Sequence, residues 1–142
     1  MTRDRLKNYL NLRREIRQIE ERLEELETRV LSPRTPKLSL TPKAHGQGGY
    51  SLEADMDKHA DLMTLYADKL AQLYDEQYAI EQAVDKLDTV ERIVIRARYI
   101  EGLTWEAVAL RVNYSYVQTW RIHARAIEAL EKQEEKQNAV HV

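Results

Sequence analysis

The chain of 142 residues contains no cysteine. This absence excludes disulfide bridges, thiolate zinc sites and a cysteine nucleophile, and it agrees with a reducing compartment. The chain also lacks any apolar run approaching the roughly 20 residues that span a bilayer, and its first residues lead into charged sequence instead of a signal-peptide core. We therefore expect a soluble protein that acts in the cytoplasm.

Helix-breaking residues are scarce and clustered, since all three prolines and three of the four glycines lie within residues 33–49. On either side of this cluster, apolar positions alternate at intervals of three and four residues, as in the seam of a coiled coil. The first seam comprises Tyr9, Leu12, Ile16, Ile19, Leu23, Leu26 and Val30. The second seam comprises Leu52, Met56, His59, Met63, Tyr66, Leu70, Leu73, Gln77, Ile80, Val84 and Leu87. The spacing predicts two coiled-coil helices, at about residues 3–31 and 51–88, joined by a Pro/Gly loop at residues 32–50.

Neither of these helices can bury its seam alone. An antiparallel hairpin within one chain satisfies the pattern, and so does the pairing of two or more chains. The second helix is the longer one, so we expect its remaining apolar positions to pair in a homodimer or to pack against the C-terminal region. His59 and Gln77 interrupt the second seam, where they either set the register or occupy partly exposed positions.

The net charge of −2 is an average over unlike segments. Residues 51–88 carry three lysines against ten acidic residues, a net charge of −7. This acidic face is either a solvated surface or a docking surface for a basic protein. The loop at residues 32–50 carries Arg34, Lys37 and Lys43 and no acid. It is either a flexible connector or a basic flap that contacts DNA phosphates or a partner.

From Asp88 onward the pattern changes to short helices with local start and stop signals. The start signals are the capping pairs Asp88 with Glu91 and Ser115 with Gln118, and the cap Thr104. The stop signals are Gly102 and Asn113, which are expected to end their helices in the left-handed conformation with positive φ. These signals predict helices at about residues 89–101, at residues 105–112, and from about residue 116 onward. A short helix, a turn centred on Asn113 and a following helix that starts within three residues indicate a helix-turn-helix.

Apolar residues at helical spacing predict the interior of this trihelical unit. They are Ile93, Val94, Ala97 and Ile100 in its first helix, and Val108, Ala109, Val112, Tyr114, Ile122, Ala126 and Leu130 in the helix-turn-helix. Residues 111–127 hold three arginines and no acid. The last helix also carries Tyr116, Gln118, Thr119, Trp120 and His123, which can donate hydrogen bonds or stack. The expected DNA-facing helix is therefore locally cationic.

The sequence over residues 90–109, 113–116 and 121–130 resembles region four of bacterial sigma factors. It is most similar to the phage-encoded sigma-region-four-like regulators, a group that includes activators of the ArpU and RinA type. The elements that carry this resemblance are Arg98-Tyr-Ile-Glu-Gly102, Thr104-Trp-Glu106, Tyr114-Ser-Tyr116 and Arg121-Ile-His-Ala-Arg-Ala126. They cover about a third of the chain.

The resemblance implies a regulator that binds promoter DNA and controls late or packaging genes of a prophage. Carried over by position, the base-reading residues of sigma factors fall on Tyr116, Val117 and Arg121, and phosphate contacts fall on Gln118 and Trp120. Tyr116 and Val117 replace the charged pair with which sigma factors read the minus-35 element, so a different target sequence is expected. The complete predicted DNA-binding set is Ser115, Tyr116, Val117, Gln118, Thr119, Trp120, Arg121 and Arg125.

Each of these side chains also has a plainer interpretation. Arg121 is either a reader of a guanine edge or a solvated arginine, and Arg125 is expected to anchor a phosphate. Trp120 either contacts a phosphate or packs the small domain, Trp105 is interpreted as a packing residue, and His123 is interpreted as a helix-surface residue. Ser115 is a helix cap first, although helix N-termini also suit phosphates.

Two hypotheses about function compete with that of a regulator. One is a small terminase-type DNA-packaging protein, and the other is an RNA polymerase-binding adaptor or anti-sigma-like protein. No catalytic constellation is found and the four histidines show no metal spacing, so we expect no enzymatic activity, metal or cofactor. The expected partners are double-stranded promoter DNA, bacterial RNA polymerase and a second copy of the chain, with no membrane and no small-molecule substrate.

The sequence thus predicts an all-α protein in three parts. Residues 1–88 form a coiled-coil hairpin, residues 89–131 form the sigma-region-four-like helix-turn-helix domain, and residues 132–142 form a charged tail.

Overall fold

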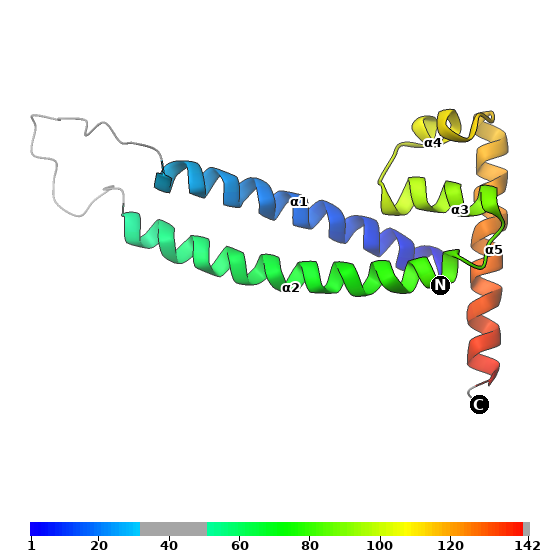
Figure 1. Ribbon diagram of the computed structural model, residues 1–142, viewed down its shortest axis with the longest axis horizontal. Helices are drawn as coiled ribbons and strands as arrows, with labels where there is room; N and C mark the ends of the chain where they lie inside the picture. Colours follow the sequence, from blue (N-terminus) through cyan, green and yellow to red (C-terminus); the bar gives the residue numbers. More distant parts are fainter. Residues whose placement is uncertain (32–50, 141–142) are drawn as a thin grey trace, which may run out of the picture. The chain divides into compact units, whose positions relative to one another are not determined.

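The computed structural model describes residues 1–31 and 51–140, and their regular secondary structure is helical (Figure 1). The helices are α1 (Arg3–Leu31), α2 (Leu52–Val84), α3 (Thr89–Ile95), the π-helix η1 (Arg96–Ile100), α4 (Trp105–Val112) and α5 (Tyr116–Val140). The described part of the chain contains no β-strand. The predicted all-α fold class is therefore confirmed, while the basic loop at residues 32–50 lies outside the described residues. No helix in the ranges given above is long and apolar enough to cross a membrane.

The chain forms two compact units. One comprises residues 15–70, and the other comprises residues 1–14 together with residues 71–142. This division differs from the predicted domain boundary at residue 88. The physical reason is that the predicted helix-turn-helix segment shares one hydrophobic core with the first turns of α1 and the last turns of α2.

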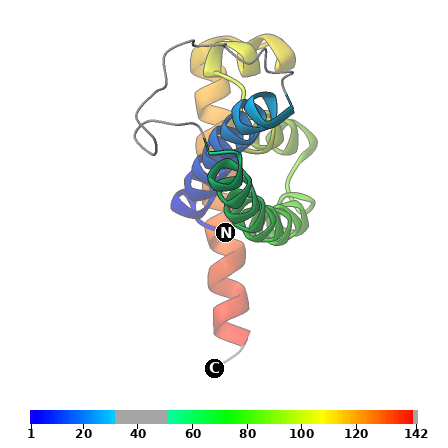
Figure 2. The ribbon, with the colours of Figure 1, turned by 90° about the vertical axis from the view of Figure 1, so that its left-hand side faces the viewer.

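In the unit of residues 15–70, the C-terminal part of α1 and the N-terminal part of α2 lie side by side (Figures 1 and 2). Four pairs of side chains connect the two helices: Lys69 with Glu15 at 3.4 Å, Tyr66 with Glu20 at 3.0 Å, His59 with Glu27 at 3.1 Å, and Arg29 with Asp55 at 3.6 Å. The residue numbers fall on α2 as they rise on α1, so the two segments are antiparallel. All these contacts are formed within a single chain.

The predicted seam residues of this unit are buried on α1 but partly exposed on α2. On α1, Ile16, Ile19, Leu23 and Leu26 are buried, as the spacing predicts. On α2, Leu52, Met56 and Met63 are 48%, 54% and 42% exposed, so their assignment to the seam is wrong. The buried or half-buried residues of this part of α2 are Asp55, His59, Leu62, Tyr66, Lys69 and Leu70. The face of α2 that meets α1 keeps His59, Tyr66 and Leu70 of the predicted seam but also contains Asp55 and Lys69, so the apolar spacing by itself does not identify it.

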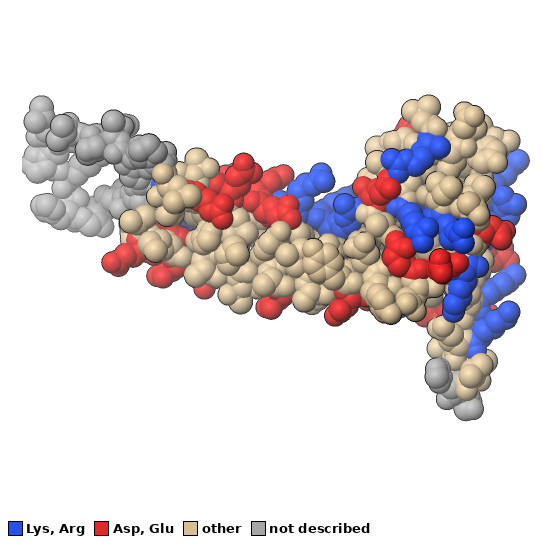
Figure 3. Space-filling model, in the orientation of Figure 1, with Lys and Arg blue, Asp and Glu red and all other residues tan. Residues whose placement is uncertain are grey.

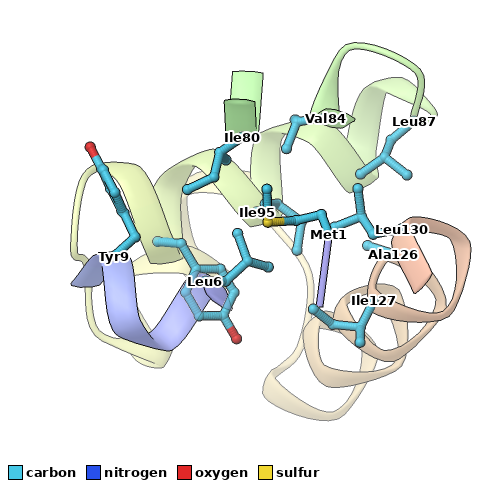
Figure 4. Close-up of a cluster of buried hydrophobic side chains, with 11 residues drawn as sticks. Met1, Leu6, Tyr9, Ile80, Val84, Leu87, Ile95, Ala126, Ile127 and Leu130 are labelled. Atoms are coloured by element: carbon cyan, nitrogen blue, oxygen red, sulfur yellow. The ribbon is translucent and has the colours of Figure 1, made fainter. Parts of the chain in front are cut away.

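The larger core lies in the unit of residues 1–14 and 71–142 (Figure 4). It brings together residues from both ends of the chain: Met1, Leu6, Tyr9, Ile80, Val84, Leu87, Ile95, Tyr99, Ala126, Ile127 and Leu130. Hydrogen bonds also connect α1 with α2 in this unit. Arg5 donates to both carboxylate oxygens of Glu76, and the Tyr9 hydroxyl donates to the side-chain oxygen of Gln77. The first turns of α1 are therefore part of the support for α5.

A second, smaller core lies under α4, where Val94, Ala97, Val108 and Ile122 meet. Helix α3 lies between the two cores, with Val94 facing one and Ile95 facing the other. Ile93, which the spacing places in the interior, is consequently turned outward and 40% exposed. Of the other predicted interior residues, Ala109, Ala126 and Leu130 are buried, whereas Tyr114 is 43% exposed.

The local signals in this unit are accurate with one exception. Asp88 is the N-cap residue of α3, but its side chain makes no capping hydrogen bond. The predicted capping box of Asp88 and Glu91 is therefore wrong, because the Asp88 side chain does not accept a hydrogen bond from the helix. Helix α2 ends at Val84, a few residues earlier than expected, and Leu87 follows in a turn closed by a 2.9 Å bond from its N–H to the Val84 carbonyl.

Candidate nucleic-acid interface

Two residues with positive φ set the path of the chain around α4. Gly102 has φ 72° and Asn113 has φ 60°, as the sequence predicts. Glycine pays no steric cost in this conformation and asparagine is among the few other residues that adopt it readily. Thr104 caps α4 by accepting a hydrogen bond from the N–H of Ala107 at 3.2 Å. Helix α4 thus has a fixed start and a fixed end.

Helix α5 begins three residues after the αL residue Asn113, and a reciprocal cap stabilises its first turn. The Ser115 hydroxyl oxygen accepts from the N–H of Gln118 at 3.1 Å, and the Gln118 side-chain oxygen accepts from the N–H of Ser115 at 3.2 Å. This is the capping box that the sequence predicts. It positions Tyr116 and Val117 at the exposed beginning of α5, where they are 47% and 56% exposed.

The outward face of α5 continues from this start along successive turns. Gln118, Arg121 and Arg125 are all exposed on it. With Tyr114, Ile122 and Ala124 they line an open groove with a volume of about 540 Å³. Among the described residues, neither Arg121 nor Arg125 forms a salt bridge. The groove therefore presents two uncompensated guanidinium groups.

Acidic side chains are absent from this stretch, because residues 111–127 contain no aspartate or glutamate. Arg111, at the end of α4, is the one arginine of the stretch that is paired, with Glu101. Figure 3 shows Lys and Arg side chains along the outer edge of α5. A cationic helix face of this kind attracts phosphates, and planar guanidinium groups can also bind the edge of a guanine.

Two of the predicted DNA-binding residues, Thr119 and Trp120, pack against other parts of the protein. Thr119 is 1% exposed and its hydroxyl donates to the Ser115 carbonyl at 2.9 Å, so it belongs to the packing of α5. Trp120 is only half-buried, but its ring stacks on Trp105 with the centroids 4.4 Å apart. Trp105 in turn lies under the guanidinium of Arg98, 4.7 Å from its ring centre. The packing interpretation of Trp105 agrees with these contacts.

The interpretation of His123 as a helix-surface residue is wrong, because its side chain is 2% exposed. Its Nε2 atom lies 2.7 Å from the hydroxyl of Tyr99, and its ring meets those of Trp105 and Trp120 edge-on. Burial and, to a smaller extent, the positive charges of Arg3, Arg98 and Lys7 together lower the pKa of His123 to about 4. Burial also raises the pKa of Tyr99 above its usual value of 10.0. Both groups are therefore neutral at physiological pH.

Sequence reasoning missed three residues that line the groove, Tyr114, Ile122 and Ala124. Tyr114 was assigned to the interior of the turn, yet it lines the groove four residues before Gln118. The spacing of Tyr114, Gln118, Arg121 and Arg125, at intervals of four, three and four residues, is the signal that could have placed it on this face.

A comparison with known proteins identifies the family but no individual relative. No curated protein and no solved structure matches the chain. A family model described as "Protein of unknown function (DUF722)" matches residues 3–132, which include helices α1 to α4 and most of α5. The chain therefore belongs to the DUF722 family.

Proposed function

We propose that this protein is a DNA-binding transcriptional regulator that inserts the first turns of α5 into the major groove. The observation that carries the proposal is the outward face of α5, where Arg121 and Arg125 lie one turn apart without acidic partners. The reciprocal cap at Ser115 and the αL turn at Asn113 support it, because they fix the direction of this helix on a small core.

In this proposal the exposed side chains make two kinds of contact with DNA. Tyr116, Val117 and Arg121 contact base edges, and Gln118 and Arg125 contact the phosphate backbone. Phosphate contacts hold the helix in register and base contacts select the sequence. Thr119 and Trp120 contribute indirectly, by holding α5 on its core.

The regulator acts on promoters in the cytoplasm of a bacterial host, as an activator of late or packaging genes of a prophage. The resemblance to the phage-encoded sigma-region-four-like regulators supports this part of the proposal. RNA polymerase and a second copy of the chain are the protein partners that such a role calls for. No enzymatic step is part of it.

The test is a selection followed by a measurement of affinity. Duplexes enriched by the full-length protein from a random library, and fragments flanking its gene, are titrated by fluorescence anisotropy at several salt concentrations. We expect one enriched sequence to bind at least about 10³-fold tighter than random duplex, with an affinity that falls as salt rises. Equal affinity for all duplexes at every salt concentration contradicts sequence-specific regulation. Transcription of a reporter that carries the enriched sequence then tests activation.

A further inference from the structure

An apolar stripe runs along the exposed side of α2 in the unit of residues 15–70. It comprises Leu52, Met56, Ala60, Met63 and Ala67, at intervals of four, four, three and four residues, and all five are exposed. This spacing keeps the five side chains on one face of a helix for about 22 Å. The stripe is distinct from the face of α2 that meets α1.

The stripe has an acidic border. Each member is followed directly by a polar residue, and these residues are Glu53, Asp57, Asp61, Thr64 and Asp68. Because consecutive residues of a helix are about 100° apart, they form a second line beside the apolar one. None of the four carboxylates forms a salt bridge with another residue of the ranges 1–31 and 51–140.

The charge of the whole unit is of the same sign. Its described residues, 15–31 and 51–70, contain eleven acidic and five basic side chains, a net charge of −6. A second copy of this unit on the stripe would bring like charges together, which opposes association. A cationic partner would instead be attracted by the border and could bury its apolar face on the methionines. Methionine suits such a surface because its flexible side chain adapts to the shape of the partner.

We propose that this stripe is a docking site for a cationic amphipathic helix of another protein. The partner helix carries an apolar seam flanked by Lys or Arg, and about four turns of it match the length of the stripe. Met56 and Met63 supply the contact area, and Asp57 and Asp61 pair with the flanking cations. This site lies on different residues from the DNA-binding face of α5, and the inference does not depend on that function.

The experiment uses the full-length protein without DNA and a fluorescein-labelled peptide of about 18 residues, the length that four to five turns require. The peptide has leucines at seam positions and lysines elsewhere, and a scrambled peptide of the same composition is the charge control. Anisotropy titrations compare wild-type protein with Met56→Gln/Met63→Gln and with Asp57→Asn/Asp61→Asn. Leu65→Gln is the matched control, since Leu65 is 43% exposed on α2 but outside the stripe. Circular dichroism verifies that every variant keeps its helix content.

We expect wild-type protein to bind the amphipathic peptide at least about tenfold tighter than the scrambled one. The methionine pair should lose this preference, the aspartate pair should weaken binding and reduce its salt dependence, and Leu65→Gln should change neither. Equal binding of both peptides, or full affinity in the methionine variant, overturns the proposal. So does a wild-type dimer in light scattering that Met56→Gln/Met63→Gln converts to a monomer, because a second copy then covers the stripe. A further variant replaces residues 32–50 by a neutral linker. If the amphipathic peptide binds only to this variant, the chain's own connector covers the stripe, and the proposal is overturned.

Discussion

The hydroxyl of Tyr99 and the Nε2 atom of His123 lie 2.7 Å apart in the interior of the protein, where each side chain is 2% exposed. Tyr99 belongs to η1 and His123 to α5, so this hydrogen bond connects the π-helix to the helix that carries the candidate interface. It satisfies two polar groups that water cannot reach. A buried polar group without a partner costs about 1–3 kcal/mol, which makes the pair a requirement of this core.

Replacing Tyr99 with Phe should therefore destabilise the protein. The substitution removes the hydroxyl, keeps the ring and leaves His123 without its partner, so the free energy of unfolding should fall by about 1–3 kcal/mol. Urea unfolding followed by circular dichroism measures this change. Tyr114→Phe is the matched control, because Tyr114 is 43% exposed and its hydroxyl can bind water in either state. An equal loss of unfolding free energy in both variants would show that the Tyr99–His123 hydrogen bond does not contribute to stability.

The lowered pKa of His123 predicts that stability declines in acid. The folded-state pKa of His123 is about 4, against about 6.5 for a histidine in an unfolded chain, so the unfolded chain binds more protons between these two pH values. Stability that is complete above pH 6.5 should fall as pH falls toward 4, by up to roughly 3 kcal/mol. His123→Phe should lack this component, and the difference between its pH profile and that of wild type isolates it from the titration of carboxylates. Parallel profiles between pH 7 and pH 4 would contradict a neutral buried His123.

The αL conformation of Asn113 makes a further prediction about stability. At φ 60°, a β-branched side chain is strained whereas glycine is not. Asn113→Val should lower the free energy of unfolding by about 1–2 kcal/mol, and Asn113→Gly should be close to neutral. Thermal and urea unfolding of the two variants test this directly. A loss as large in the glycine variant would indicate that the asparagine side chain, and not its backbone conformation, matters at this turn.

Local signals in the sequence predicted much of the fold. Helices α1 and α4 have the predicted bounds, and Gly102 and Asn113 have the predicted positive φ. The Ser115–Gln118 cap also forms as expected. These features depend on residues within one or two turns of each other, so they can be recognised without knowledge of the tertiary structure.

Features that depend on distant neighbours were not predictable in the same way. His123 looks like a surface residue in the sequence because its partner, Tyr99, lies 24 residues earlier on another helix. Met56 is exposed because another face of α2 meets α1, and that face contains Asp55 and Lys69, which an apolar pattern does not select. Asp88 has the right residue type for a cap, but its side-chain conformation depends on its surroundings. In each case the missing information is a contact between elements.

Arginine variants on the outward face of α5 test the mechanism of DNA recognition. If Arg121 binds a guanine edge, Arg121→Ala should reduce discrimination at one base pair by about 1–3 kcal/mol. If Arg125 binds a phosphate, Arg125→Ala should weaken binding to all sequences and reduce the salt slope by about one. Arg17→Ala, at an exposed position of α1 in the unit of residues 15–70, is the matched control for the loss of one positive charge.

The measurement that separates these roles is anisotropy on the selected duplex and on its single-base variants, at several salt concentrations. A base contact gives a loss of affinity that disappears when the contacted base pair is already changed, because the contact is then absent in both proteins. A phosphate contact gives the same loss on every duplex. Uniform losses in both variants would make Arg121 a second phosphate anchor and leave base selection to Tyr116 and Val117. Wild-type affinity in both variants would remove α5 from the DNA interface, because two unpaired guanidinium groups on a DNA-facing helix cannot be silent.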